Sequence, residues 1–170
     1  MSELGLLKEG GFALDLGCGD GSDSDALKAL GYEVTPVDIG SPYPSIKEDI
    51  RRYRIDPDRY DVIICNNVLP FISDKEDVKK ALANIFQGLN DHGVAFLTFF
   101  GPKDDWAQRP TMSFFDFAEI TGYLRSFGLF ILESSTTEGY GKTMKGNIKY
   151  CHIHRFLCSK AAFNPSPCPQ

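Results

Sequence analysis

The sequence predicts an α/β fold built on a doubly wound, mostly parallel, Rossmann-like sheet. Short runs rich in β-branched and aromatic residues alternate with segments of helical apolar spacing. A glycine-rich loop, Gly17–Gly21, follows the first of these runs. The length of 170 residues suffices for one domain with a buried core and is too short for two substantial ones. The ligand site of such a sheet is expected outside the carboxyl ends of its strands.

Strands are expected where short apolar runs are bounded by turn residues. In chain order these runs are Phe12–Leu16, Glu33–Val37, Tyr60–Cys65, Val94–Phe100, Leu129–Ser134 and Ile148–Cys158. A further short run at Ser45–Glu48 decides between a seven-stranded sheet and a six-stranded one.

Helices are expected between these strands, where capping residues precede apolar residues at helical spacing. Ser22 or Ser24 can cap a short first helix that ends at Leu30, before a glycine. Ser73, with Glu76 three residues later, forms a capping box for a second and longer helix. These signals place one helix directly after the glycine-rich loop.

A third helix is expected to open at Ser113 and to stop at Gly128. Residues 1–160 then form a single domain that contains all of the predicted strands and helices. Residues 161–170 are expected to be a flexible tail, because they hold three prolines in the last six positions and few apolar groups.

The composition is that of an ordinary globular protein with a formal net charge of −5. This charge disfavours a nucleic acid or an anionic membrane as the partner, although Arg51, Arg52 and Arg54 form a local basic cluster. No stretch reaches the roughly 18 apolar residues of a membrane span. Unpaired thiols in a reducing compartment, and hence a cytoplasmic protein, are expected because the cysteines are odd in number and form no C-x-x-C pair: Cys18, Cys65, Cys151, Cys158 and Cys168.

The loop after the first strand carries the most specific pattern. Three glycines at every second position from Gly17 to Gly21 allow a sharp backbone turn and a close approach by a ligand. A dinucleotide fingerprint needs its third glycine one position later, where this chain has Ser22. Asp15 and Asp20 would also repel a pyrophosphate, whereas they would attract a cationic ligand. The loop therefore argues against a nicotinamide-dependent oxidoreductase.

The stretch Ala13–Gly21 resembles the first motif of class I methyltransferases, which implies S-adenosylmethionine as the cofactor and S-adenosylhomocysteine as the product. It also implies a Rossmann-like sheet with an antiparallel last strand, and residues 1–160 as the S-adenosylmethionine-binding domain. The implied cofactor-binding residues are Asp15, Gly17, Cys18, Gly19, Gly21, Asp38, Ile39, Asp49, Ile50, Asn66, Asn67 and Val68.

Three of these segments have distinct implied roles. Asp38, at the end of the second strand, would accept hydrogen bonds from the ribose hydroxyls. Asp49 and Ile50 would hold the adenine, although Asp49 could equally cap a short helix. The segment Asn66–Val68 would contact the methionine portion. It lacks the Pro-Pro-aromatic sequence of enzymes that methylate base amines, which disfavours base methylation.

The acceptor side is expected in the second half of the chain. The long loop after the run ending at Phe100 holds Trp106 and Arg109, which could form a wall and an anion clamp. The alternative is a tryptophan packed over the sheet edge beside an exposed arginine. Phe71 and Lys142 are the other candidate substrate-binding residues.

Three candidate catalytic residues are Tyr140, Lys149 and His152. An antiparallel last strand would bring its beginning, and therefore Lys149, to the cofactor end. A lysine there would raise the ionised fraction of a soft anion, and Tyr140 or His152 could take a proton from a hydroxyl or an amine. His152 and His154 could instead be core histidines, and no metal site is expected because a third ligand is lacking.

The layout from Leu14 to Lys160 resembles the small-molecule methyltransferases of the tellurite-resistance type. This chain has Lys142 and Lys145 where that family offers a histidine and an arginine, which argues against tellurite. The predicted function is methyl transfer to a small-molecule thiol, chalcogen oxyanion, hydroxyl or amine by a monomer or homodimer. The alternative is a non-catalytic cofactor-binding module or a partner subunit.

Overall fold

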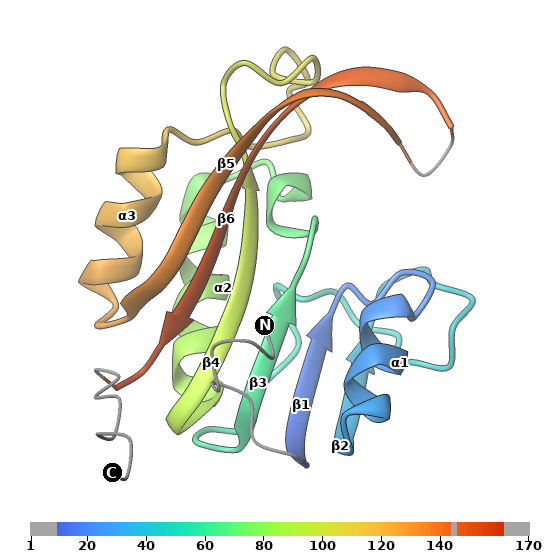
Figure 1. Cartoon of the computed structure of the whole chain (residues 1–170), viewed down its shortest axis with the longest axis vertical. Helices are drawn as coiled ribbons and strands as arrows, with labels where there is room; N and C mark the ends of the chain where they lie inside the picture. Colours follow the sequence, from blue (N-terminus) through green and yellow to red (C-terminus); the bar gives the residue numbers. More distant parts are fainter. Residues whose placement is uncertain (1–9, 144–145, 162–170) are drawn as a thin grey trace, which may run out of the picture.

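The computed structural model describes residues 10–143 and 146–161, which form a six-stranded sheet of order β2-β1-β3-β4-β6-β5 (Figure 1). The neighbours from β2 to β4 pair in parallel, and β6 runs antiparallel to both β4 and β5. The strands are β1 (Gly11–Leu16), β2 (Tyr32–Val37), β3 (Tyr60–Cys65), β4 (Leu89–Phe100), β5 (Phe130–Lys142) and β6 (Ile148–Ser159). The predicted fold class is confirmed in its six-stranded form.

Helices pack on both faces of this sheet. They are α1 (Ser22–Ala29), α2 (Lys75–Gly88) and α3 (Phe117–Ser126), with a short 3-10 helix η2 (Leu69–Phe71). Leu27 of α1 belongs to one apolar cluster of the sheet, whereas the buried residues of α2 and α3 belong to the other. The sheet is therefore doubly wound, as the sequence predicts.

Successive side chains along β1 point to opposite faces of the sheet, so they enter different apolar clusters. Leu14 and Leu16 pack in the larger cluster, with α2 and α3. Ala13 and Asp15 point to the opposite face, where Ala13 joins the cluster of α1 and Asp15 bonds to Ser24 of that helix. The first strand is thus buried on both faces, as expected for a central parallel strand.

The sheet differs from the prediction in the length of three elements. The run Ser45–Glu48 is not a strand, since only Ile46 bridges to Val37. β4 begins at Leu89 and not at Val94, because its first residue pairs with β3 across a register shift. β5 continues past Ser134, because its polar half finds hydrogen-bonding partners along β6 and needs no apolar alternation.

The helix starts also differ from the capping predictions. Gly21 is the N-cap of α1, and the predicted cap Ser24 donates instead to the buried Asp15. The N-cap of α2 is Asp74, one residue after the predicted Ser73, and its carboxylate accepts from the Glu76 amide at 2.8 Å. A carboxylate there also complements the helix dipole.

The third helix starts later than Ser113. Asp116 is its N-cap, and the preceding residues remain extended because Phe115 N donates to Phe100 O. This path buries the Phe115 ring against Phe99, with centroids 5.6 Å apart. Gly128 follows the helix end with φ 78°, a left-handed conformation that suits glycine, as predicted.

The β5–β6 hairpin extends beyond the rest of the sheet. Its outer half passes the carboxyl ends of the parallel strands and curves away as a two-stranded arm (Figure 1). Several side chains on this arm are exposed, including Tyr140 at 80% and Ile148 at 70%. Its two strands pair with each other along their length.

Several sequence predictions concern parts outside the described residues. Lys145 and all but the first residue of the predicted tail 161–170 lie there. Within the described residues, no helix is long and apolar enough to cross a membrane. The cysteines among them are free thiols, namely Cys18, Cys65, Cys151 and Cys158. The cytoplasmic location stays a prediction.

Leu82 on α2 provides a test of the larger core cluster, because its side chain is fully buried there. We expect Leu82→Ala to lower the free energy of unfolding by about 2–5 kcal/mol in urea titration, through lost apolar burial and a cavity. Leu30→Ala, at a position 45% exposed, is the matched control and should cost far less. Equal losses in the two variants would contradict this packing.

Candidate functional site

The glycine-rich loop is shaped by two close approaches. Gly17 and Gly21 have φ of 73° and 87°, in the left-handed region that favours glycine. A Cβ at Gly17 would overlap the Val68 side chain, and one at Gly21 would overlap the ring of Tyr43. Gly17 N also donates to Val37 O at 2.7 Å, which ties the loop to the end of β2. Both glycines are therefore required by conformation and by space.

Asp38 joins the glycine loop to the loop after β2. Its carboxylate accepts from the backbone amides of Gly19 at 3.1 Å, Gly40 at 2.8 Å and Ser41 at 2.7 Å. The Ser41 hydroxyl in turn donates to Gly19 O. Charge-assisted hydrogen bonds of this kind are stronger than neutral ones, so the two loops are held in fixed relative positions.

A cleft of about 610 Å³ opens at the carboxyl ends of β1, β2 and β3. Five carboxylates line it, against the single cationic side chain of Arg51, so the cleft has a negative electrostatic balance. The lining residues are Gly17, Cys18, Gly19, Asp20, Ser22, Asp23, Asp38, Ile39, Glu48, Asp49, Ile50, Arg51, Asn66, Asn67, Val68, Phe71, Ile72 and Ser73.

The wall after β2 contains the Asp49–Arg51 pair. Arg51 Nε donates to both carboxylate oxygens of Asp49 at 3.0 Å, and these hydrogen bonds lower the pKa of Asp49. Asp49 also accepts from the Arg51 amide at 2.9 Å, as a turn cap does. Both sequence interpretations of Asp49 are thus compatible with its position, since it caps the turn and lines the cleft beside Ile50.

The wall after β3 is formed by Asn66 and Asn67. The Asn66 amide donates to Asp23 at 3.1 Å, which orients one of the cleft carboxylates. Asn67 has φ 57°, a conformation that asparagine tolerates better than most residues. Its backbone N–H donates to the buried Thr98 hydroxyl at 2.5 Å. These contacts position Val68 over Gly17.

Asp15 and Gly21, both predicted to bind the cofactor, do not line the cleft. Asp15 lies beneath the glycine loop at 1% exposure, where it accepts a 2.6 Å hydrogen bond from Ser24. Burial raises its pKa to about 6. Asp20 and Asp23, in contrast, line the cleft with their carboxylates.

The predicted acceptor residues Phe71, Trp106 and Arg109 come together beyond this cleft. The rings of Phe71 and Trp106 are 6.2 Å apart, and the Arg109 guanidinium lies 4.4 Å from the Trp106 ring. Phe71 is 53% exposed and lines the cleft, so the aromatic cluster continues the cleft wall. Lys142 is not part of it, because it lies near the end of the hairpin arm.

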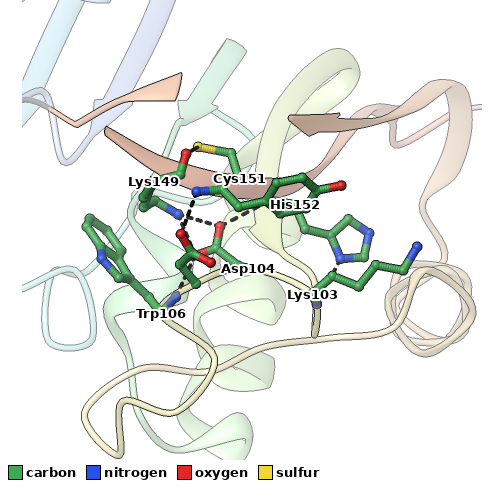
Figure 2. A network of polar contacts seen from close by, with 8 residues as sticks. Lys103, Asp104, Trp106, Lys149, Cys151 and His152 are labelled. Atoms are coloured by element: carbon green, nitrogen blue, oxygen red, sulfur yellow. Dashed lines mark hydrogen bonds and ion pairs between the residues drawn. The ribbon is translucent and has the colours of Figure 1, made fainter. Parts of the chain in front are cut away.

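The predicted catalytic residues have other partners. Lys149 is buried in an ion pair with Asp104, as Figure 2 shows. His152 Nδ1 accepts from the Lys103 amide at 3.1 Å, so the neutral ring carries its proton on Nε2, which lies 3.6 Å from Glu138. Tyr140 is exposed on the arm and packs against another tyrosine. None of the three lines the cleft, and their catalytic roles stay untested predictions.

Sequence reasoning missed Asp104, whose carboxylate accepts from Lys149 Nζ, from Trp106 N at 3.0 Å and from His152 N at 3.2 Å (Figure 2). It also missed Asp23 and Glu48 as cleft carboxylates. Asp23 follows the glycine loop by two residues and could have been found from that spacing. Asp104 meets a strand 45 residues away, and no local pattern announces such a pairing.

Among the residues that the structure describes, no group of three or more His, Cys, Asp or Glu side chains could hold a metal ion. Burial and the neighbouring His152 lower the pKa of His154, whose ring also packs against Phe117 at 5.6 Å. This environment fits the core-histidine interpretation of that residue.

The doubly wound sheet, its antiparallel end and the acidic cleft at the glycine loop define an α/β protein of the class I methyltransferase type. The methyltransferase-domain family matches residues 2–133. The chain belongs to that family, whose class I members use S-adenosylmethionine. The predicted family and cofactor are therefore confirmed.

Two curated relatives are similar over part of their length. A putative methyltransferase, YqeM, of Bacillus subtilis is 29% identical over 103 residues, which cover 52% of this chain and 42% of the relative. The ubiquinone biosynthesis O-methyltransferase of Proteus mirabilis is 27% identical over 88 residues, which cover 42% and 36%. The matched regions are thus less than half of either relative.

Solved structures share the fold. TehB of Haemophilus influenzae is similar with a TM-score of 0.76 and 23% identity, over 94% of this chain and 61% of that one. The 1,6-didemethyltoxoflavin-N1-methyltransferase of Burkholderia thailandensis gives 0.73 and 20%, over 95% and 74%. A methyltransferase of Methanosarcina mazei gives 0.71 and 19%, over 94% and 96%.

The pKa of Asp15 predicts a pH dependence of stability. A carboxyl whose pKa rises from 3.8 to about 6 on folding stabilises the protein fully below pH 3.8, and that contribution is lost as pH rises through 6. Asp15→Asn cannot ionise. Relative to the parent, it should therefore gain about 2–3 kcal/mol of unfolding free energy between pH 4 and pH 7.5 in urea titrations.

Asp20→Asn is the control for this measurement. Its carboxyl is exposed, and hydrogen bonds from Ser22 lower its pKa, so the substitution should not reproduce the gain. If the stabilities of Asp15→Asn and the parent change in parallel with pH, the raised pKa of Asp15 is wrong.

Proposed function

We propose that this chain binds S-adenosylmethionine in the acidic cleft and transfers its methyl group to a small molecule. The observation that carries the proposal is the charge of the cleft, where five carboxylates and a glycine loop surround about 610 Å³. Carboxylates favour a ligand with an ammonium and a sulfonium, and they disfavour the pyrophosphate of a dinucleotide.

The residues of the cleft fit the cofactor by the kinds of group they offer. Asp38 would hold the ribose, Asp49 and Ile50 the adenine, and the segment Asn66–Val68 with the glycine loop the methionine portion. When bound, S-adenosylmethionine would supply a methyl group carried by a positively charged sulfur. A lone pair of the acceptor would form the new bond to this methyl carbon, and the sulfur would keep the electron pair of the broken C–S bond.

The protein contributes mainly position. Holding two reactants close and aligned can supply roughly 7–11 kcal/mol of the barrier. Asp38 and the backbone donors around it fix the loops of the cleft, and the exposed ring of Phe71 in the cleft wall is where an acceptor would pack. Lys149 is paired with Asp104, and His152 Nδ1 already accepts from the Lys103 amide, so neither is assigned as the base. The proton of the acceptor is proposed to pass to water.

The acceptor is proposed to be a small molecule that bears a thiol, chalcogen oxyanion, hydroxyl or amine. We also propose that the protein acts in the cytoplasm, as a monomer or a homodimer. The free thiols among the described cysteines are consistent with a reducing compartment. The negative net charge of −5 argues against a nucleic acid as the acceptor.

Calorimetric titration with S-adenosylhomocysteine tests the cofactor site. We expect Asp38→Ala to weaken binding roughly 10- to 100-fold, because a charged acceptor of hydrogen bonds is lost. Asp91→Ala removes an exposed carboxylate outside the cleft and is the matched control. Thermal unfolding separates loss of binding from loss of fold, and equal affinity in the two variants would contradict the assigned site.

Turnover is tested by incubating the protein with methyl-labelled S-adenosylmethionine and a panel of thiols, chalcogen oxyanions, phenols and amines. A labelled product supports catalysis. Bound cofactor with no product from any acceptor supports the non-catalytic module instead. Tight binding of NAD without affinity for S-adenosylhomocysteine would overturn the proposed function altogether.

A further inference from the structure

An aromatic platform continues the wall of the cofactor cleft from Phe71. We define it as Phe71, Phe100 and Trp106, whose rings contact one another pairwise with centroids 6.2 Å apart. Phe71 lines the cleft and is 53% exposed, and Trp106 is partly exposed. The rings are inclined to one another by 53–68°, so a flat molecule that entered beside the cofactor would meet the exposed face of Phe71 with Trp106 next to it.

The platform is held from behind by the buried Asp104–Lys149 pair. Lys149 Nζ lies 4.3 Å from the centroid of the Trp106 ring and 4.9 Å from that of Phe100. Asp104 neutralises this charge, and it accepts from the Trp106 amide within the loop and from His152 N of β6, so it anchors the loop to that strand (Figure 2). The pair therefore positions the platform and leaves no net charge there.

Arg109 places an exposed positive charge beside the platform. Its guanidinium stacks 4.4 Å from the Trp106 ring centroid, and its amide donates to Trp106 O at 2.8 Å, so a turn fixes its place. The side chain is exposed, and within residues 10–143 and 146–161 no carboxylate lies within 4.0 Å of it. The other cation of this loop, Lys103, is paired with Glu138 at 2.8 Å.

The electrostatics of the two halves are thus opposite. The cofactor end of the cleft is lined by carboxylates, whereas the rim of the platform presents the Arg109 guanidinium, which has no carboxylate partner in the described part of the chain. Guanidinium groups bind carboxylates through parallel hydrogen bonds and also stack on aromatic rings. A cationic acceptor would be repelled at this rim, and an anionic one would be attracted.

We propose that the acceptor is a planar, ring-containing small molecule that carries an anionic group. Its ring stacks on the exposed ring of Phe71 and lies beside Trp106, and its anion pairs with Arg109. This inference rests on the proposed methyltransferase function, and it narrows the acceptor class. The nucleophilic thiol, hydroxyl or amine is then carried by the ring and directed toward the cleft, while the anionic group stays at the rim.

The single tryptophan of the chain gives a direct readout. Quenching of Trp106 fluorescence is measured during titration with benzoate, with its neutral analogue benzamide and with benzylamine, all at saturating S-adenosylhomocysteine. We expect benzoate to bind about tenfold or more tightly than benzamide, because a charge-assisted pair is added. Benzylamine should bind most weakly.

Arg109→Gln should abolish the preference for benzoate over benzamide and leave the affinity for S-adenosylhomocysteine unchanged in calorimetry. Arg125→Gln, in the last turn of α3, is the matched control and should keep the preference. Phe71→Ala should weaken benzoate and benzamide by similar factors, because it removes stacking and no charge.

The outcomes separate the two proposals. Equal affinity for benzoate and benzamide, quenching by neither, or an unchanged preference in Arg109→Gln would overturn the acceptor class while S-adenosylhomocysteine still binds. Failure of the parent protein to bind S-adenosylhomocysteine would instead overturn the proposed function.

Discussion

The convergence of three backbone amides on the Asp38 carboxylate is the interaction on which the loops around the acidic cleft depend. It joins the loop after β1 to the loop after β2, and each loop alone would be a short irregular segment with unsatisfied donors. The left-handed glycines Gly17 and Gly21 let the first loop reach this carboxylate while Val68 and Tyr43 pack against it. Local conformation and one acidic side chain thus produce a preformed wall.

A different principle organises the acceptor end. There the Asp104–Lys149 pair is buried, and its formation costs desolvation of both charges, so it contributes little to net stability. Its effect is on geometry, because the pair fixes the Trp106 loop against β6. Breaking the pair would leave an uncompensated buried charge next to the Trp106 loop.

The sequence was most informative where the determining interactions are local. The glycine spacing from Gly17 to Gly21 and the apolar run Tyr60–Cys65 each predict an element that the structure contains. The helix starts were wrong by one to four residues, because several adjacent polar residues can cap and tertiary contacts choose among them. Ser24, for example, is recruited by the buried Asp15.

Non-local pairing escaped prediction for a physical reason. Lys149 looked like a free cation at the start of a strand, and only its contact with Asp104, 45 residues away, makes it a positioning group. The length of β5 escaped in the same way, since polar residues such as Thr136 and Thr137 are retained by their hydrogen-bonding partners on β6. Apolar periodicity cannot reveal a strand whose two faces are both exposed.

The hairpin arm has a consequence for how the two ends of the molecule tolerate change. Its outer residues, among them Tyr140 and Ile148, contribute little to either core cluster. Local opening of the arm therefore requires less free energy than opening of β1 or β3. Substitutions and insertions at its exposed positions can accumulate while the loops around the cleft keep their form, so the tip of the arm can diversify independently of the cleft.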